Sequence, residues 1–165
     1  MTRWLSDDEQ RAWLRLAGVM LKLSPALDSQ LQRDSDLTHF DYLCLAMLSE
    51  SEDHTLRMSD LAQRTNATLS RLSHVISKLE NRGWVARAPS PHSRRVTMVT
   101  LTDEGWRVLV EAAPGHVETV RALVFDGLGP EDVAALERVA GHIVDGIDGC
   151  RLGPPEADSL SPLAD

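Results

Sequence analysis

Apolar residues recur at helical spacing along much of this chain, and the pattern is clearest between residues 69 and 79. There the apolar side chains lie three and four positions apart, so they share one face of a helix. The opposite face has no acid, and its groups can donate hydrogen bonds to phosphates and to base edges in a major groove. An ordinary surface helix with a solvated face would show the same amphipathic spacing. The members of this polar face are Ser70, Arg71, Ser73, His74, Ser77 and Lys78.

Two capping boxes, each a Ser or Thr with an acid three residues later, predict the starts of the first two helices. The box at Ser6 opens a helix over about residues 7–33, and Pro25 inside it should kink or divide that helix. The box at Thr38 opens a second helix that extends to about Ser49.

The segment that follows has the pattern of a helix-turn-helix and a hairpin. Ser59 should cap a short third helix, and the polar-faced helix should end at Gly83, where a left-handed residue is expected. Residues 84–88 and 96–101 have the composition of β-strands, and residues 89–95 form a loop with turn signals between them. A helix-turn-helix followed by a hairpin is a winged helix, so we expect a mainly α fold with a small β-hairpin wing.

Long helices flank the expected winged helix. Thr102 starts a helix whose apolar stripe continues across a bend at Pro114, and Pro130 suits the first turn of a last helix. The apolar residues of that last helix are spaced three and four apart, like a short coiled-coil seam. We expect dimerisation helices over 1–36 and 102–149, a winged helix-turn-helix DNA-binding domain over 37–101, and a disordered tail over 150–165.

The charge of the chain is unevenly distributed. The 165 residues are 42% apolar and 25% charged, as expected for one globular domain with or without helical extensions. The formal net charge is −8, yet residues 64–95 contain seven Lys and Arg and one acid, Glu80, so this segment carries +6 on a body of −14. An acidic body with one basic patch directs polyanion binding to that patch.

The remaining composition narrows the class of protein. Two cysteines, Cys44 and Cys150, cannot form a disulfide framework. The chain has neither the pattern of a signal peptide nor an apolar run long enough to cross a membrane. We therefore expect a soluble, cytoplasmic protein.

Five short segments between residues 37 and 105 carry the most specific signal. They are Leu37–Tyr42, Met58–Ala62, Leu79–Arg87, Ser90–Arg95 and Val99–Gly105. The combination of L-E-x-R-G, a basic wing and L-T-x-x-G at this spacing resembles the MarR (multiple antibiotic resistance regulator) family of bacterial transcription factors. The resemblance implies a homodimer with interlocking terminal helices, whose recognition helices enter the major grooves of a pseudo-palindromic operator and whose wings reach the neighbouring minor grooves.

The resemblance also implies roles for particular residues. The polar face over residues 70–78 would lie in the major groove, and Arg95, with Arg94, would lie at the wing. A wing arginine favours a narrow, electronegative minor groove. Family members commonly carry an acid where this chain has Ser93, and that acid helps to hold the wing. Ser93 can form a hydrogen bond but no ion pair, so we expect a looser wing.

The family often binds small aromatic or phenolic ligands between the dimerisation helices and the winged helix. The ordinary alternative for each apolar residue in that region is packing in the core or at the dimer seam. The residues that could line such a crevice are Trp13, Leu16, Met20, Phe40 and Leu43.

Other chemistry has weaker support. The six histidines show no local metal-binding spacing, so no metal or cofactor is expected, although His39 and His116 could meet across helices. Cys44 could be a peroxide-sensing thiol, as in some relatives, but its apolar neighbours favour an inert core cysteine. No nucleophile motif, P-loop or dinucleotide fingerprint is present, so an enzyme is not expected.

Three hypotheses follow. The first is a dimeric repressor that a small ligand releases from double-stranded DNA. The second is a regulator of the same fold that a metal or a redox change switches. The third is a winged helix used only for protein–protein assembly, which the basic patch and the acid-free polar face disfavour.

Overall fold

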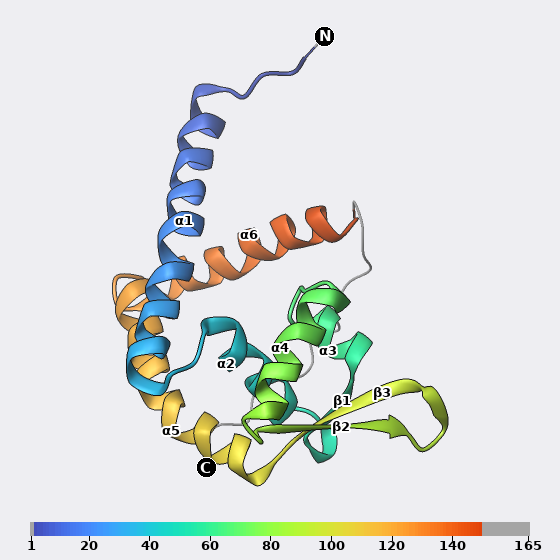
Figure 1. The fold of residues 1–165 in the computed structure, drawn as a ribbon. Coiled ribbons are helices and arrows are strands. Elements are labelled where there is room, and N and C mark those ends of the chain that lie inside the picture. The colour runs from blue at the N-terminus through green and yellow to red at the C-terminus, as the bar shows by residue number, and fades with distance from the viewer. Residues whose placement is uncertain (1, 150–165) are drawn as a thin grey trace.

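The computed structural model describes residues 2–149, and within them the chain forms six α-helices and one three-stranded sheet (Figure 1). None of the helices in this described part is long and apolar enough to cross a membrane. The elements in chain order are α1 (Asp7–Ser35), α2 (His39–Ser49), β1 (Thr55–Arg57), α3 (Met58–Arg64), α4 (Leu69–Asn81), β2 (Val85–Ser90), β3 (Ser93–Leu101), α5 (Asp103–Val120) and α6 (Pro130–Gly149). A short 3-10 turn, Glu52–His54, precedes β1, and a π-helical segment, Arg121–Phe125, extends α5.

The first helix starts as predicted but is not divided. The Ser6 hydroxyl accepts from the Glu9 amide and the Glu9 carboxylate accepts from the Ser6 amide, which completes the capping box. The helix then runs through Pro25 as one element, so the expected division is wrong. Pro25 deprives the residue 21 carbonyl of its amide partner, but Leu21 is highly exposed and water can satisfy that group.

A single hydrophobic core holds the winged helix together. Its fully buried side chains come from the end of α1 and the segment after it, and from α2, α3, α4 and β3, which therefore pack as one unit. On the predicted apolar face of α4, Leu72, Ile76 and Leu79 are buried, Val75 is partly buried, and Leu69 at the first turn is exposed. The central members of this core are Leu45, Leu48, Leu61, Leu72, Ile76, Leu79 and Val99.

The sheet has the order β1-β3-β2, with both pairs antiparallel. The hairpin of β2 and β3 is longer than predicted, because Ser90 pairs with Ser93 and only Pro91 and His92 form the turn. The expected loop over 89–95 is therefore wrong at both ends. Strand β1 was not predicted, because three residues are too few to show an alternating pattern.

The start of α3 also differs from the prediction. Its N-cap is Arg57, whose side chain forms no capping hydrogen bond, and Ser59 lies inside the helix. Arg57 is also the last residue of β1 and pairs with Met98. Because the sheet already fixes the backbone at this point, a side-chain cap is not needed to start the helix.

Two of the motifs quoted above pack against each other where the wing meets α5. Gly83 ends α4 in the left-handed region at φ 76°, as predicted. The Thr102 hydroxyl donates to the Gly83 carbonyl at 2.7 Å, and the Thr102 amide donates to the Trp84 carbonyl at 3.0 Å. Gly105 lies so close that a Cβ there would overlap the Trp84 carbonyl. The L-E-x-R-G and L-T-x-x-G segments therefore form one joint.

The outer helices lie away from this core. The N-terminal half of α1 projects from the winged helix, and α6 runs out from the end of α5 (Figure 1). Both helices expose large apolar side chains, among them Leu14 and Leu21 on α1 and Val139 and Ile147 on α6, and Trp4 before α1 is exposed as well. The tail expected to be disordered lies outside the described residues.

Cys44 belongs to the core of the winged helix. Its side chain is fully buried. Burial, with a smaller effect of the Asp41 carboxylate, raises the pKa of the thiol to about 12, although Arg71 opposes the rise. A thiol needs access and a lowered pKa to react as a sensor, so this geometry favours the inert reading.

We expect Gly105→Ala to destabilise the protein. The added methyl group would overlap a backbone carbonyl that cannot move without opening the joint between wing and α5. The free energy of unfolding should fall by about 1–3 kcal/mol, the usual cost of overpacking. Gly141→Ala is the matched control, because a Cβ there meets nothing within 4 Å. Urea unfolding that showed equal stability for both variants would contradict the close contact.

We expect Cys44 to be unreactive in the folded protein. In a Cys150→Ser background, an alkylating reagent at pH 8 should leave the native thiol unmodified and react fully after denaturation. Because the folded pKa is raised, stability is full below the unfolded value of 9.0 and falls as pH rises toward about 12. Titration of Cys44 should contribute a slope of up to about 1.4 kcal/mol per pH unit, and that contribution should be absent in Cys44→Ala. Rapid native alkylation would restore the redox hypothesis.

Candidate nucleic-acid interface

The polar face of α4 has an exposed edge that points away from the protein. Ser70, Ser73 and His74 are all exposed, and no acid lies in the first turn of the helix. The N-cap is Thr68, whose hydroxyl accepts from the Arg71 amide at 3.2 Å. A capped helix start without acids presents partial positive charge, which suits a phosphate or another anion.

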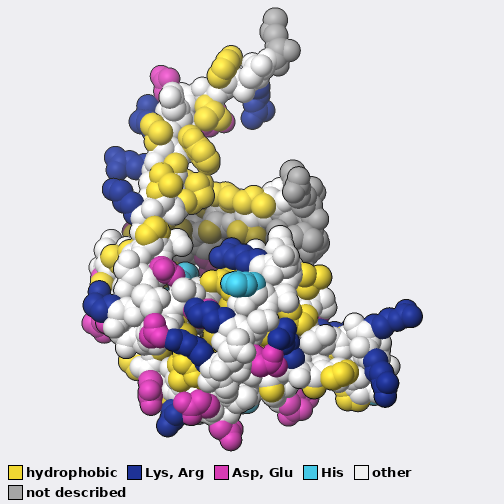
Figure 2. All heavy atoms as spheres, in the orientation of Figure 1, with side chains coloured by type: hydrophobic (Ala, Val, Ile, Leu, Met, Phe, Trp, Pro, Cys, Tyr) yellow, Lys and Arg dark blue, Asp and Glu magenta, His cyan; other side chains and the backbone are white. Residues whose placement is uncertain are grey.

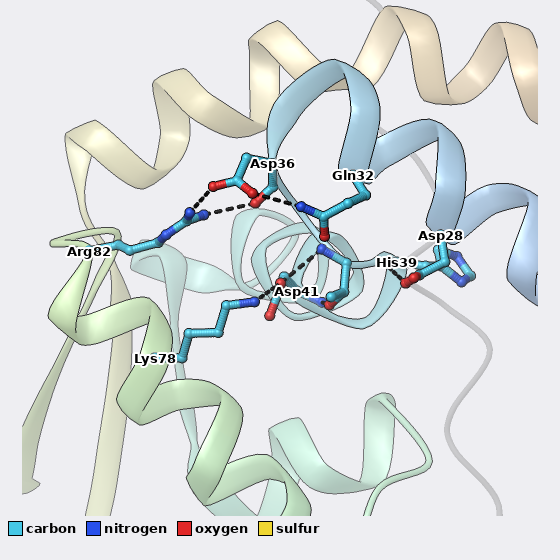
Figure 3. A network of polar contacts seen from close by, with 8 residues as sticks. Asp28, Gln32, Asp36, His39, Asp41, Lys78 and Arg82 are labelled. Atoms are coloured by element: carbon cyan, nitrogen blue, oxygen red, sulfur yellow. Dashed lines mark hydrogen bonds and ion pairs between the residues drawn. The ribbon is translucent and has the colours of Figure 1, made fainter.

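The basic residues of α4 lie on a different edge, which faces α1 and α2. The guanidinium of Arg71 lies 4.2 Å from the centre of the Phe40 ring. Lys78 Nζ is 2.5 Å from Oδ2 of Asp41. Figure 3 shows this ion pair beside the one between Arg82 and Asp36. The predicted polar face therefore has two edges: one is open to solvent, and the other contacts α2 and the end of α1 although Arg71 itself remains exposed.

These contacts neutralise part of the basic patch. Among the described residues, three of its seven basic side chains form ion pairs: Lys78, Arg82 and Arg87. Arg87 pairs with Glu80 through two guanidinium nitrogens, and the hydrogen bonds from Arg87 lower the pKa of the Glu80 carboxyl. The charge available to a polyanion is therefore smaller than the sequence count of +6 indicates.

The wing carries its arginines on a strand. Arg94 and Arg95 are both exposed near the start of β3, and Lys and Arg side chains gather over α4 and at the outer end of the hairpin (Figure 2). Adjacent strand residues point to opposite faces, so the two arginines cannot enter one groove together. The Ser93 hydroxyl accepts from the Arg95 amide at 3.4 Å. This long bond is the local support that Ser93 gives to the wing.

The five residues considered for a ligand crevice do not come together within one chain. Trp13 and Met20 are about half exposed, and 23 and 16 helical residues separate them from Asp36 at the end of α1. At 1.5 Å per residue these separations are about 35 and 24 Å. Phe40 and Leu43, with Leu16, are partly buried, and Phe40 packs under Arg71.

A buried polar cluster lies between α1, α2 and α5. The rings of His39 and His116 are 5.6 Å apart, and Tyr42 lies 4.3 Å from His116. Burial is the main cause that lowers the pKa of both histidines. Nδ1 of His116 and Oε1 of Gln30 are buried without a hydrogen-bond partner. Within residues 2–149, however, no group of three metal-ligating side chains comes together.

Sequence reasoning did not identify the acids that bind the basic edge of α4. Asp36 and Asp41 lie 46 and 37 residues from their partners, and no local pattern connects them. Thr68 was also missed, although a Thr before a helical run is a recognisable capping signal.

The chain is similar to several known regulators. Residues 37–97 match the MarR family. A crystal structure of Sco3205, a MarR family transcriptional regulator from Streptomyces coelicolor in complex with DNA, is 40% identical, has a TM-score of 0.86 and covers 94% of this chain and 97% of that one. The HTH-type transcriptional repressor Rv2887 of Mycobacterium tuberculosis is 35% identical over 121 residues, which cover 73% of this chain and 84% of that protein.

The curated relatives differ in how much of their length is matched. The chain spans 42% of the HTH-type transcriptional regulator PapX of Escherichia coli, with 33% identity over 69 residues. The structural relative at 40% identity is matched over almost its whole length and shares the fold. This chain belongs to the MarR family of transcriptional regulators.

Proposed function

We propose that this protein is a homodimeric repressor that binds a pseudo-palindromic operator in double-stranded DNA. The observation that carries the proposal is the exposed, acid-free edge of α4 beside a hairpin with two exposed arginines. Sco3205, at 40% identity, has been crystallised with DNA, and Rv2887 is a repressor, which supports the same activity here. The protein would act in the cytoplasm, where a bacterial chromosome lies.

The outer helices support a dimer. A helix with an exposed apolar stripe needs a partner, because a large apolar surface is costly to leave in water. Figure 2 shows apolar side chains gathered on α1 and α6, outside the winged helix. On α6 the predicted seam residues Val133, Leu136 and Ile143 are all more than a third exposed. A second copy of the chain is the partner that a two-fold operator requires.

The exposed edge of α4 and the arginines of the hairpin suggest how the protein would bind DNA. Ser70, Ser73, His74 and the partly buried Ser77 would face the major groove, and Arg95 would read the width of the minor groove. Phosphate neutralisation would supply most of the affinity, so binding should weaken as salt rises. The two reading helices of the dimer must lie about 34 Å apart to enter adjacent major grooves.

Release by a small ligand is the proposed regulation. A ligand that prefers a dimer with a different helix spacing would weaken DNA binding by shifting the population away from the matching form. The crevice residues on α1 and α2 are far apart in one chain, so such a site would need a second copy to complete it. Equal operator affinity with and without every effector tested would count against this regulation.

One observation favours a metal-switched regulator as the second candidate. His39 and His116 are close enough to share a ligand, and one ring nitrogen lacks a partner. A metal site would need a third donor from outside the described contacts. A chelator that changed operator affinity would support this candidate.

We expect the purified protein to select one inverted repeat from a random pool of duplexes. The half-sites should lie one helical turn apart, because a two-fold dimer presents two identical reading helices. The selection should be run at two salt concentrations. If no sequence is enriched at either, the operator-binding repressor must be abandoned in favour of non-specific binding or an assembly role.

We expect Arg95→Ala to weaken binding to the selected duplex by about tenfold and to lower the slope of log K against log salt by about 2, because each dimer loses two arginines. Arg94→Ala is the matched control, since its side chain leaves the hairpin on the opposite face. Fluorescence anisotropy over a salt series gives both quantities. Unchanged affinity in Arg95→Ala would show that this arginine is not the wing contact.

A further inference from the structure

The basic edge of α4 is bound to the corner between α1 and α2, the segment Asp36–Asp41 (Figure 3). Lys78 and Arg82 lie one helical turn apart on α4, and each reaches an acid of this corner. Arg82 also donates to the Asp36 main-chain carbonyl at 2.8 Å, and its guanidinium lies 4.5 Å from the centre of the Trp84 ring. Both side chains are therefore held by contacts within the chain.

The corner itself is built from hydrogen bonds that leave little freedom. Asp36 ends α1 in the left-handed region at φ 53°, and Gln32 Nε2 donates to its carboxylate at 2.6 Å. The His39 amide donates to Asp28 of α1 at 2.9 Å. Asp41 Oδ2 accepts from the Thr38 amide at 2.8 Å and so caps α2. A helix bound to this corner takes its position from both α1 and α2.

The side chains of Lys78 and Asp41 differ in exposure, and that difference determines the role of the lysine. The Asp41 side chain is 1% exposed, whereas that of Lys78 is 42% exposed. Without its cation this buried carboxylate would keep its desolvation cost and retain only the hydrogen bond from the Thr38 amide, so the lysine is favoured at this position. For Lys78 to reach a DNA phosphate, it would have to leave a buried negative charge unpaired.

We propose that Lys78 is a positioning residue: it fixes the reading helix to the α1–α2 corner through Asp41, with Arg82 supporting the same contact, and it neutralises no phosphate. This inference rests on the proposed DNA-binding function. It gives Lys78 a positioning role in place of the DNA contact that the sequence predicted. In that case only the solvent-exposed edge of α4 would enter the major groove of the DNA. The Arg82–Asp36 contact transmits the position of α1 to α4.

Two substitutions separate positioning from phosphate contact. Lys78→Met keeps the length of the side chain without its charge, and Asp41→Asn keeps an oxygen to cap α2 but removes the partner of the lysine. If Lys78 and Asp41 act as a positioning pair, each single variant should bind the selected operator about tenfold more weakly. The double variant should lose little further affinity, because the two residues share one interaction. The slope of log K against log salt should equal that of the wild type.

A phosphate-binding lysine gives the opposite pattern. Asp41→Asn would then free the lysine and leave operator affinity equal or higher, while Lys78→Met would lower the salt slope by about 2, because each dimer loses two lysines. Either result would overturn the proposal. Arg95→Ala in the same series shows that a change of slope can be detected.

A merely structural role is excluded by specificity. If Lys78 positions the reading helix, the ratio of operator affinity to random-duplex affinity should fall in Lys78→Met. The ratio should recover partly in Lys78→Arg. Circular dichroism and the melting temperature give the folded fraction of each variant, by which its affinities are corrected. An unchanged ratio at full folding would overturn the proposal. Absence of any operator for the wild-type protein would instead reject the proposed function, so the two failures are distinguishable.

Discussion

Burial of the apolar face of α4 is the constraint on which the rest of the molecule depends. Leu72, Ile76 and Leu79 are fully buried in the core of the winged helix, so the rotation of the helix about its axis is set by the core. Because the opposite positions must then face outward, the exposed serines and histidine follow from packing. The core thus orients the reading edge, and the contacts with the α1–α2 corner determine where that edge lies.

Much of the fold could be predicted because its signals are local. The capping boxes at Ser6 and Thr38, the stop at Gly83 and the start at Pro130 each depend on residues within one turn. The errors also have local causes. Pro25 is accommodated inside an exposed helix, and Ser59 is displaced as a cap because the end of β1 already sets the backbone.

The candidate site was less predictable because its decisive contacts are distant in sequence. Periodicity grouped Lys78 with His74 on one polar face, and that grouping is correct for a helix viewed alone. Only the fold shows that Asp41 lies against one edge of this face and not the other. In the same way the count of basic residues was correct, but it could not show which of them already have acidic partners.

The uninterrupted course of α1 through Pro25 has a mechanical consequence. When a continuous helix tilts about its distal end, its other end moves sideways by a distance proportional to its length. About 35 Å separates Trp13 from Asp36 at 1.5 Å per residue, so a tilt of about 5° about the distal end displaces the corner by about 3 Å. That displacement approaches the spacing of neighbouring base pairs, and a helix divided at Pro25 would have absorbed it.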